Sequence, residues 1–199
     1  MMQIARLSLR VLVSFLAMFC LVGCNASSDY MHPGVPPSAP AADAATIIFI
    51  RPSGYASGQL MTVLDTNGRF LGDSLAKSYF SVKVTPGEHV FLVWGENTGA
   101  LRATVAGGKT YYVEVSTKLG WLSARVHLLA LTPRHENWKE LQEWLTDSKP
   151  LAPDEAKGQA YLASRRDDVQ ERIRRALDAL GKYDADELNA RTILPQDGQ

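Results

Sequence analysis

Apolar and polar residues alternate with a period of two along much of the chain between Thr46 and Thr132. Phe80, Val82 and Val84, for example, are each separated by one residue, and this spacing places them on one face of a strand. Residues that favour turns interrupt the pattern about every ten positions. The pattern predicts a mainly β protein with some α structure: an antiparallel β-sandwich of about seven or eight strands, followed by C-terminal helices.

Short β-branched and aromatic runs define the predicted β domain, residues 46–132. Asn67-Gly68 tolerates positive φ and favours the type I′ turn of a tight hairpin. The run His89–Trp94 is apolar on both faces after its histidine, which predicts a central strand covered from both sides. The predicted strands are Thr46–Arg51, Gln59–Asp65, Arg69–Gly72, Ser78–Val84, His89–Trp94, Leu101–Val105, Thr110–Val115 and Ser123–Leu131.

Residues 133–199 change to the three- and four-residue spacing of helices and predict a helical C-terminal extension. Thr132-Pro133 has the form of a helix start. The aromatic face of the first helix consists of Trp138, Leu141, Trp144 and Leu145. We expect this face to pack on an open face of the β domain. A surface for a protein partner or for the membrane interface is the alternative, because tryptophan suits half-wet settings.

A second helix is predicted from Pro153 to Leu180, since Gly181 is a residue type that commonly follows a helix. Pairs with the acid first at i,i+4 spacing, such as Asp168/Arg172, indicate that much of this helix faces solvent. Its apolar stripe is narrow and consists of Val169, Ile173, Ala176, Leu177 and Leu180.

The start of the chain has the arrangement of a secretory leader. Arg6 and Arg10 precede 12 mostly apolar residues at 11–22. This length is typical of a signal peptide and is shorter than the roughly 20 residues of a spanning helix. The run closes on Leu21-Val22-Gly23-Cys24, which resembles the lipobox of bacterial lipoproteins.

The resemblance to bacterial lipoproteins implies that residues 1–23 are a signal peptide and that Cys24 is lipidated. In that family the cysteine thiol receives a diacylglyceryl group, the preceding peptide is removed, and acyl chains such as palmitate hold the protein on the membrane. Several chains anchor a protein stably where one binds only marginally. Asn25, in place of the aspartate that retains enteric lipoproteins in the inner membrane, favours the outer membrane. A short uncleaved anchor, or cleavage near Ala26, is the alternative.

Residues 24–45 predict a tether between the lipidated Cys24 and the β domain. Pro33, Pro36, Pro37 and Pro40 lie among Ser, Ala and Gly without apolar periodicity, and such a segment cannot bury enough surface to fold. Prolines favour extended polyproline II at about 3.1 Å per residue, so we expect the domain to stand some tens of ångströms from the bilayer.

The charge balance narrows the class of expected partners, and the positions of the cysteines narrow the expected covalent chemistry. The 21 basic and 21 acidic side chains balance, so no overall field favours nucleic acid. Cys20 and Cys24 are the two cysteines, and a mature chain beginning at Cys24 would contain no disulfide and no free thiol. The partners that we expect are the membrane, through the lipid anchor, and an envelope protein, with no nucleic acid and no nucleotide.

Several short motifs recur in a fixed order over Thr46–Ser116. They are Arg51-Pro52-Ser53, Asn67-Gly68, Leu71-Gly72, Tyr79-Phe80, Pro86-Gly87-Glu88-His89 and Gly108-Lys109-Thr110-Tyr111-Tyr112. Their order and spacing resemble a small β domain of unknown function found in bacterial lipoproteins. This resemblance implies a β-sandwich tethered to the cell envelope, and it implies no known activity.

The sequence contains no complete motif for catalysis or for a bound cofactor. Gly107-Gly108-Lys109-Thr110 ends like a phosphate-binding loop, but Ala103 stands where that loop requires its first glycine. His135-Glu136 begins like a zinc-protease helix, but Lys139 occupies the place of the second ligand. A nucleophile elbow is also absent. We therefore expect no cofactor, no metal and no enzyme activity, although catalytic residues can converge from distant positions.

These observations predict a membrane-anchored envelope lipoprotein with a structural or protein-binding β domain that faces the periplasm. The alternative is an enzyme or a small-ligand carrier with a cleft between the β domain and the C-terminal helices. Glu88 and His89 could serve such an enzyme as an acid–base pair, but a turn position explains both. A deep pocket with converging polar groups would favour the alternative, and a closed apolar core would favour the first prediction.

Overall fold

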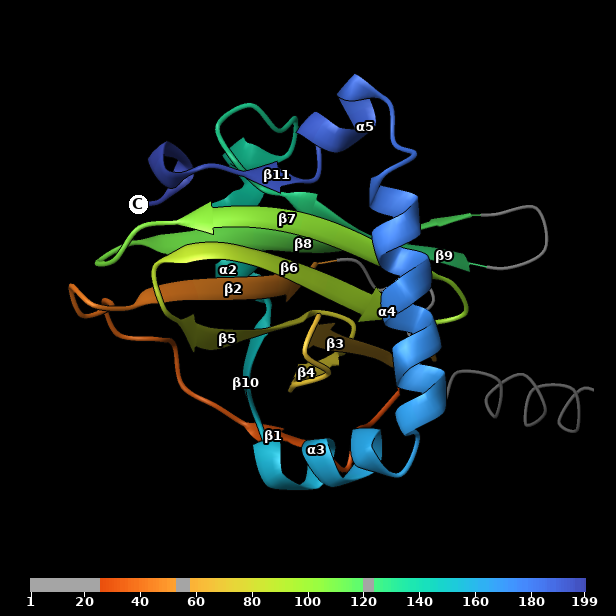
Figure 1. Ribbon diagram of the computed structural model, residues 1–199. Coiled ribbons are helices and arrows are strands. Elements are labelled where there is room, and N and C mark those ends of the chain that lie inside the picture. The colour runs from red at the N-terminus through yellow and green to blue at the C-terminus, as the bar shows by residue number, and fades with distance from the viewer. Residues whose placement is uncertain (1–25, 53–57, 120–123) are drawn as a thin grey trace, which may run out of the picture.

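The strands form two sheets in the part of the chain that the computed structural model describes, residues 26–52, 58–119 and 124–199. In chain order they are β1 (Met31–Pro33), β2 (Ala45–Arg51), β3 (Met61–Asp65), β4 (Phe70–Ser74), β5 (Ser78–Val84), β6 (Gly87–Trp94), β7 (Thr98–Val105), β8 (Thr110–Leu119), β9 (Ala124–Ala130), β10 (Lys149–Pro153) and β11 (Thr192–Ile193). The six-stranded sheet has the order β1-β10-β5-β2-β8-β9, and the five-stranded sheet has the order β11-β7-β6-β3-β4 (Figure 1).

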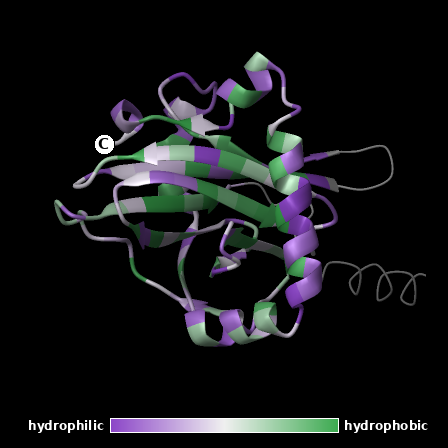
Figure 2. Cartoon of the chain, in the orientation of Figure 1, coloured by the Kyte–Doolittle hydropathy of each residue, from purple (hydrophilic) through white to green (hydrophobic). Residues whose placement is uncertain are grey.

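Helices cover the outer faces of both sheets. They are the 3-10 turn η1 (Trp138–Glu140), α2 (Leu141–Asp147), α3 (Glu155–Ala163), α4 (Arg166–Leu180), α5 (Ala185–Asn189) and the 3-10 turn η2 (Pro195–Asp197). The α4 helix contacts β6 and β7, and α3 contacts β4. Most of the α4 surface in view is hydrophilic (Figure 2), so the apolar stripe that packs on the five-stranded sheet is narrow.

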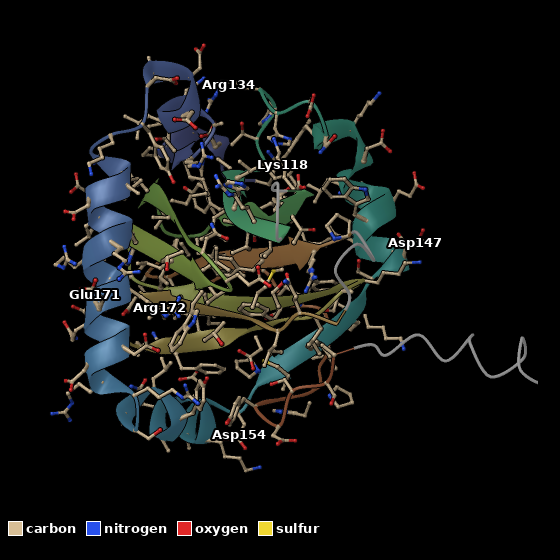
Figure 3. The ribbon with its side chains drawn as sticks, turned by 90° about the vertical axis from the view of Figure 1, so that its right-hand side faces the viewer. Lys118, Arg134, Asp147, Asp154, Glu171 and Arg172 are labelled. Carbon is tan, nitrogen blue, oxygen red and sulfur yellow. The ribbon has the colours of Figure 1, made fainter. Side chains whose placement is uncertain are left out.

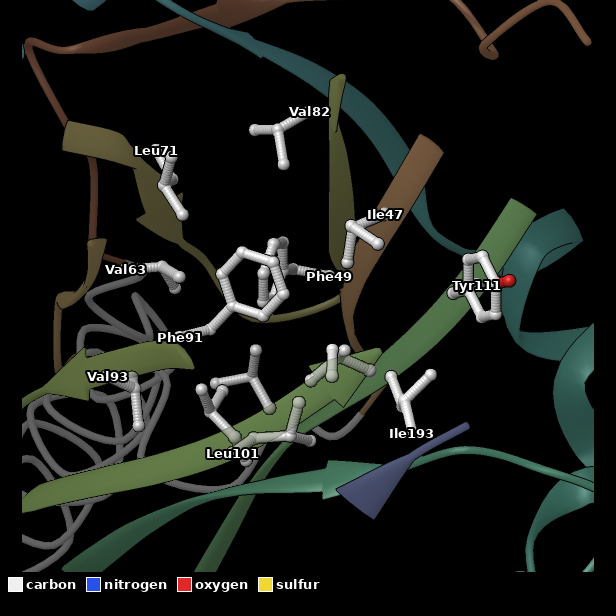
Figure 4. Packing of buried hydrophobic residues seen from close by; sticks show 14 of the residues in the cluster. Ile47, Phe49, Val63, Leu71, Val82, Phe91, Val93, Leu101, Tyr111 and Ile193 are labelled. Atoms are coloured by element: carbon white, nitrogen blue, oxygen red, sulfur yellow. The ribbon is translucent and has the colours of Figure 1, made fainter. Parts of the chain in front are cut away.

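The main core lies between the two sheets. Phe49 of β2 stacks on Phe80 of β5, with ring centroids 5.2 Å apart, and meets Phe91 of β6 edge-on at 5.4 Å. The rings of Phe49 and Phe91 lie at the centre of the cluster in Figure 4. Val82 and Val84 face this core together with Phe80, which confirms the alternation predicted for that strand.

The β6 strand is covered on both faces, as predicted from its continuous apolar run. Phe91 and Val93 belong to the core between the sheets. Leu92 lies in a second cluster with Val169 and Ile173 of α4. A strand buried from two sides can carry apolar residues at successive positions, because neither face meets water.

The prediction of a simple antiparallel sandwich of seven or eight strands is wrong, although the mainly β class and the C-terminal helices are confirmed. Both sheets are mixed: β2 pairs parallel with β8, β10 with β5, and β11 with β7. A tight turn joins β3 and β4 at the predicted place, with Gly68 at a φ of 74°. Asn67 does not have a positive φ, however, so the prediction of a type I′ turn is wrong. Local turns of this kind reveal antiparallel neighbours, whereas parallel pairs join segments that are distant in sequence.

Part of the segment predicted to be an unfolded tether is folded. β1 pairs with β10, and the Ser28 Oγ donates a hydrogen bond to the Asp73 carboxylate at 2.5 Å. Asp73 is fully buried, at 0% exposure. Burial raises the pKa of Asp73, while hydrogen bonds from Ser28 and Thr62 act in the opposite direction. The prediction failed here because a proline-rich composition indicates only that the segment cannot fold on its own. Such a segment can still add a strand to the edge of an existing sheet.

The long helix predicted from Pro153 to Leu180 is divided into α3 and α4. Pro153 ends the strand β10, and α3 begins after Asp154, whose side chain accepts a hydrogen bond from the Lys157 amide. Four of the five predicted stripe residues are buried, but Leu177 is 45% exposed. The apolar stripe is therefore narrower than predicted, and the prediction that Leu177 belongs to it is wrong.

Gly158 allows α3 to approach the five-stranded sheet closely. A Cβ atom at this position would overlap the ring of Phe70. Alanine normally stabilises a helix by up to about 1 kcal/mol relative to glycine, but overpacking of a core costs about 1–3 kcal/mol.

We expect Gly158→Ala to lower the free energy of unfolding despite its better helix propensity. Gly181→Ala is the matched control, because its nearest neighbours lie 3.6 Å or more from the added Cβ. Urea unfolding of the two variants and the wild type measures the effect. A gain of stability in Gly158→Ala would contradict the close packing of α3 on Phe70.

Candidate functional site

The predicted aromatic face packs on the outer side of the six-stranded sheet. Leu141 is buried in a cluster with Ile48, Ile50, Tyr79 and Leu131, and the partly buried residues packed against this cluster are Tyr112, Trp138, Trp144 and Leu145. The expectation that this face covers the β domain is confirmed. A role for its half-buried tryptophans in binding a partner stays a prediction.

The loop after β9 gathers polar side chains at the start of the C-terminal region. The Asn137 backbone N–H donates to His135 Nδ1 at 3.1 Å, which places the ring proton of neutral His135 on Nε2. That Nε2 lies 3.9 Å from an oxygen of Glu114 on β8. The Asn137 amide group also donates to this oxygen, at 3.2 Å. An acid and a histidine therefore meet under partial burial.

A second pair ties this loop to the end of the chain. Arg134 donates two hydrogen bonds to Asp197, at 2.7 and 2.9 Å. Asp197 also accepts a hydrogen bond from the Leu194 backbone N–H, and its side chain is almost entirely buried. Such a two-point contact fixes the geometry of both side chains. Arg134 therefore has a structural role: it holds the end of the chain against the loop after β9.

Arg191 occupies the corner between β9 and α5. Its guanidinium lies 4.4 Å from the ring centre of Tyr183, donates to the Glu187 carbonyl at 2.9 Å and approaches His127 Nδ1 at 3.4 Å. Burial lowers the pKa of His127 to about 4, and the positive charges of Arg191, Lys118 and Arg125 add to the effect.

His127 is expected to make stability depend on pH. Its native pKa of about 4 lies below the ordinary 6.5, so between these values the unfolded chain binds a proton that the native protein rejects. The contribution of neutral His127 to the free energy of unfolding is complete above pH 6.5. It is lost as the pH falls towards 4 and amounts to at most about 3 kcal/mol. We expect His127→Gln to remove this part of the pH dependence. Unfolding in urea between pH 4 and 7 tests it.

The exposed His32 provides the control for the pH prediction. His32→Gln should leave the difference between neutral and acidic pH as it is in the wild type. Equal slopes in the wild type and in His127→Gln would contradict the assignment of this pH dependence to His127.

A cavity of about 510 Å³ lies between the end of β9, the following loop and α5. Positive side chains on its wall are Lys118, Arg134 and Arg191, and negative ones are Glu136, Asp186 and Glu187. Lys118 and Arg134 are directed towards this end of the molecule in Figure 3. The cavity lies between the β domain and a C-terminal helix, and a role for it as the cleft of an enzyme or carrier stays a prediction.

The cavity offers charged and hydrogen-bonding groups, and the acid–histidine pair of Glu114 and His135 lies beside it. Among the described residues, no group of three or more His, Cys, Asp or Glu side chains could hold a metal ion. The sequence motifs point to His135 only as the start of an incomplete zinc motif, and no motif includes Glu114 or Arg191. The outward position of Glu114 in a strand with alternating apolar residues is the signal that could have found it.

The other sequence candidates are separated from this cavity. Gly107 and Gly108 form the turn that leads into β8, and Thr110 begins that strand. His89 lies near the opposite end of β6 from Trp94, its Nε2 lies 2.8 Å from the Thr85 carbonyl oxygen, and its ring stacks on Phe91. The lipobox and Cys24 lie outside the described residues.

Comparisons of the chain with protein-family models, with curated proteins and with solved structures gave no match. The similarity to the lipoprotein β domain therefore stays a prediction. In residues 26–52, 58–119 and 124–199, no helix has the length and apolar character needed to cross a membrane.

Proposed function

We propose that this protein is a membrane-anchored envelope lipoprotein whose β domain has a structural or protein-binding role in the periplasm, without catalysis. The observation that carries the proposal is the tetrad Leu21-Val22-Gly23-Cys24 at the end of a short apolar run behind Arg6 and Arg10. The apolar side chains between the two sheets are almost fully buried, and a closed apolar core supports a structural or binding module.

Labelling of the full chain with a palmitate analogue in a bacterial host tests the anchor. We expect the label on a mature protein that begins at Cys24, identified by mass spectrometry of its N-terminal peptide. Separation of the two membranes by density should place it in the outer membrane. An unlabelled mature chain that begins elsewhere would contradict the proposal.

Photo-crosslinking in intact cells tests the protein-binding role. The exposed positions Gln142 and Glu143 on α2 border the aromatic face, and a crosslinker there should capture an envelope protein. Gln170, exposed on α4, is the control position. Identical products from all three positions would argue against a binding surface at α2.

A carrier of a small ligand is the second candidate, and the cavity beside α5 favours it. Among the described residues, the Lys118 side chain on its wall forms no ion pair, so a small anion is the ligand class to test first. Nuclear magnetic resonance spectra recorded with added inorganic phosphate should then show shifts of the Thr132 and Arg191 amides. Lys118→Gln should reduce these shifts, and Lys149→Gln on β10 should not. Absence of any shift would reject phosphate as a ligand.

A further inference from the structure

The chain enters the folded domain at Ser28, much earlier than the first long strand. The Ser28 hydroxyl donates to the buried Asp73 at 2.5 Å and accepts from the Tyr30 backbone N–H at 3.0 Å. The Asp154 backbone N–H donates to the Tyr30 carbonyl at 2.7 Å. Met31 then packs against the core between the sheets and against the cluster under α4. These contacts fix residues 28–31 on the domain surface.

Only three residues, at positions 25–27, separate Cys24 from Ser28. Four steps of a fully extended chain span at most about 14 Å. An extended tether over all of residues 24–45 would instead reach about 65 Å. The contacts of Ser28 therefore shorten the available reach more than fourfold, because the prolines that follow Ser28 no longer contribute to it.

On the basis of the proposed lipid anchor, we infer that the domain is held directly against the lipid headgroups, with the surface around Tyr30 and the α3–α4 corner facing the bilayer. A domain whose own dimensions exceed the length of its link cannot turn this surface far from the membrane. The anchor thus sets the orientation as well as the distance.

The surface around Tyr30 has a chemistry that suits the headgroup layer. The Tyr30 ring lies 5.1 Å from that of Tyr161 on α3, and Tyr161 lies 6.4 Å from Trp94. Arg165 lies over Tyr161 at 5.0 Å, and Arg172 lies over Trp94 at 4.2 Å. Half-buried aromatic rings and arginine side chains both accommodate a boundary between apolar and wet surroundings.

Electrostatic attraction contributes little to this contact. Positive side chains do not predominate at the α3–α4 corner, which carries Lys157, Arg165 and Arg166 beside Asp154, Glu155, Asp167 and Asp168. The acyl chains therefore supply the affinity for the membrane, and the short link between Cys24 and Ser28 sets the orientation of the domain. We expect the orientation to be the same on neutral and on anionic lipid.

The cavity beside α5 faces away from the membrane in this orientation. The α3 and α5 helices lie at opposite ends of the molecule in Figure 1, and Asp154 and Arg134 are likewise separated in Figure 3. Asp186 and Asn189 of α5 line the cavity. The surface that carries the cavity is thus presented to the periplasm.

Fluorescence quenching on vesicles tests the orientation. The full-length protein is purified with its lipid and placed in phosphatidylcholine vesicles that contain a headgroup-labelled quencher lipid. A fluorophore is attached through Ala163→Cys at the end of α3 or through Asp186→Cys on α5, both exposed positions. The thiol of Cys24 is blocked by its own lipid. We expect strong quenching at position 163 and weak quenching at position 186.

Two insertions separate the short link from the predicted long tether. A flexible Gly-Ser segment of about 20 residues, spanning roughly 25 Å, is placed either between Ala26 and Ser27 or between the exposed Ser38 and Ala39. The first insertion should reduce quenching at position 163, and the second should leave it unchanged. Equal effects of both insertions would overturn the inference, because they would show that Ser28 does not hold the chain.

Mass spectrometry of the same protein distinguishes the two kinds of failure. A protein without lipid on Cys24 would contradict the proposed function and the inference that rests on it. A lipidated protein with equal quenching at positions 163 and 186 would overturn the inference alone.

Discussion

Replacement of Cys24 by alanine is expected to abolish lipid labelling and to remove the mature chain from the membrane fraction. The thiol is the only group of that residue that can accept the diacylglyceryl chain, and each buried CH₂ of an acyl chain contributes about 0.8 kcal/mol to membrane binding. The variant should remain as an unprocessed precursor or be released as a soluble protein. Cell fractionation and labelling with a palmitate analogue measure both outcomes.

Cys20→Ala is the matched control for this prediction. Cys20 lies within the segment that the lipobox assigns to the removed leader, so its loss should change neither labelling nor location. If a cleaved Cys24→Ala chain remained with the membranes, the interpretation of residues 21–24 as a lipobox would be wrong.

The strands that the sequence predicted well are those with local signals. Alternation located β5, and the continuous apolar run of His89–Trp94 located a strand that helices and the opposite sheet cover. Each of these signals arises within one strand and one neighbouring turn. These strands could therefore be predicted from the sequence without knowing which distant segments pair with them.

The strands β1, β10 and β11 were missed because their signals are not local. β1 ends at Pro33, and β10 contains Pro150 and Pro153, residues that ordinarily argue against a strand. The β1 strand pairs with β10, and β10 also pairs parallel with β5. Proline is tolerated in a strand where its missing N–H is not needed for pairing. Only the assembled sheet shows where that condition is met.

The candidate cavity illustrates the same limit for function. Arg134 and Asp197 are 63 residues apart, and His127 and Arg191 are 64 residues apart. A motif search detects residues at short fixed spacing, so it cannot find pairs of this kind. The proposed lipobox is the opposite case, because a processing enzyme would recognise it as a short linear segment.

The N-terminal segment shows how the structure changes a functional expectation. Proline content correctly indicated that residues 33–40 do not form a core of their own, and Val35 is 82% exposed. It did not indicate that Ser28 would bond to Asp73. The bond to this buried carboxylate therefore leaves only a short segment between Cys24 and the folded domain. With the lipid anchor that we propose, the domain would lie close to the membrane instead of at the end of a long tether.

Phe49→Ala is expected to cause the largest loss of stability, about 3–5 kcal/mol in the free energy of unfolding. Phe49 is completely buried, at 0% exposure, on a strand in the middle of the six-stranded sheet. Its removal would leave a cavity that the rigid strands on either side cannot close. It would also eliminate the ring contacts with Phe80 and Phe91, which are worth about 0.5–1.5 kcal/mol each.

Urea unfolding of the soluble chain from Ala26 onward, which retains every described residue, measures this loss. Phe49→Leu keeps much of the side-chain volume but loses both ring contacts, so it should cost about 1–2 kcal/mol. Val35→Ala alters an exposed side chain and should remain within about 0.5 kcal/mol of the wild type. A Phe49→Ala loss no greater than that of Val35→Ala would contradict a core shared by the two sheets. The graded order of the three variants is expected because the cost of a substitution follows the number of packed atoms it removes from between the sheets.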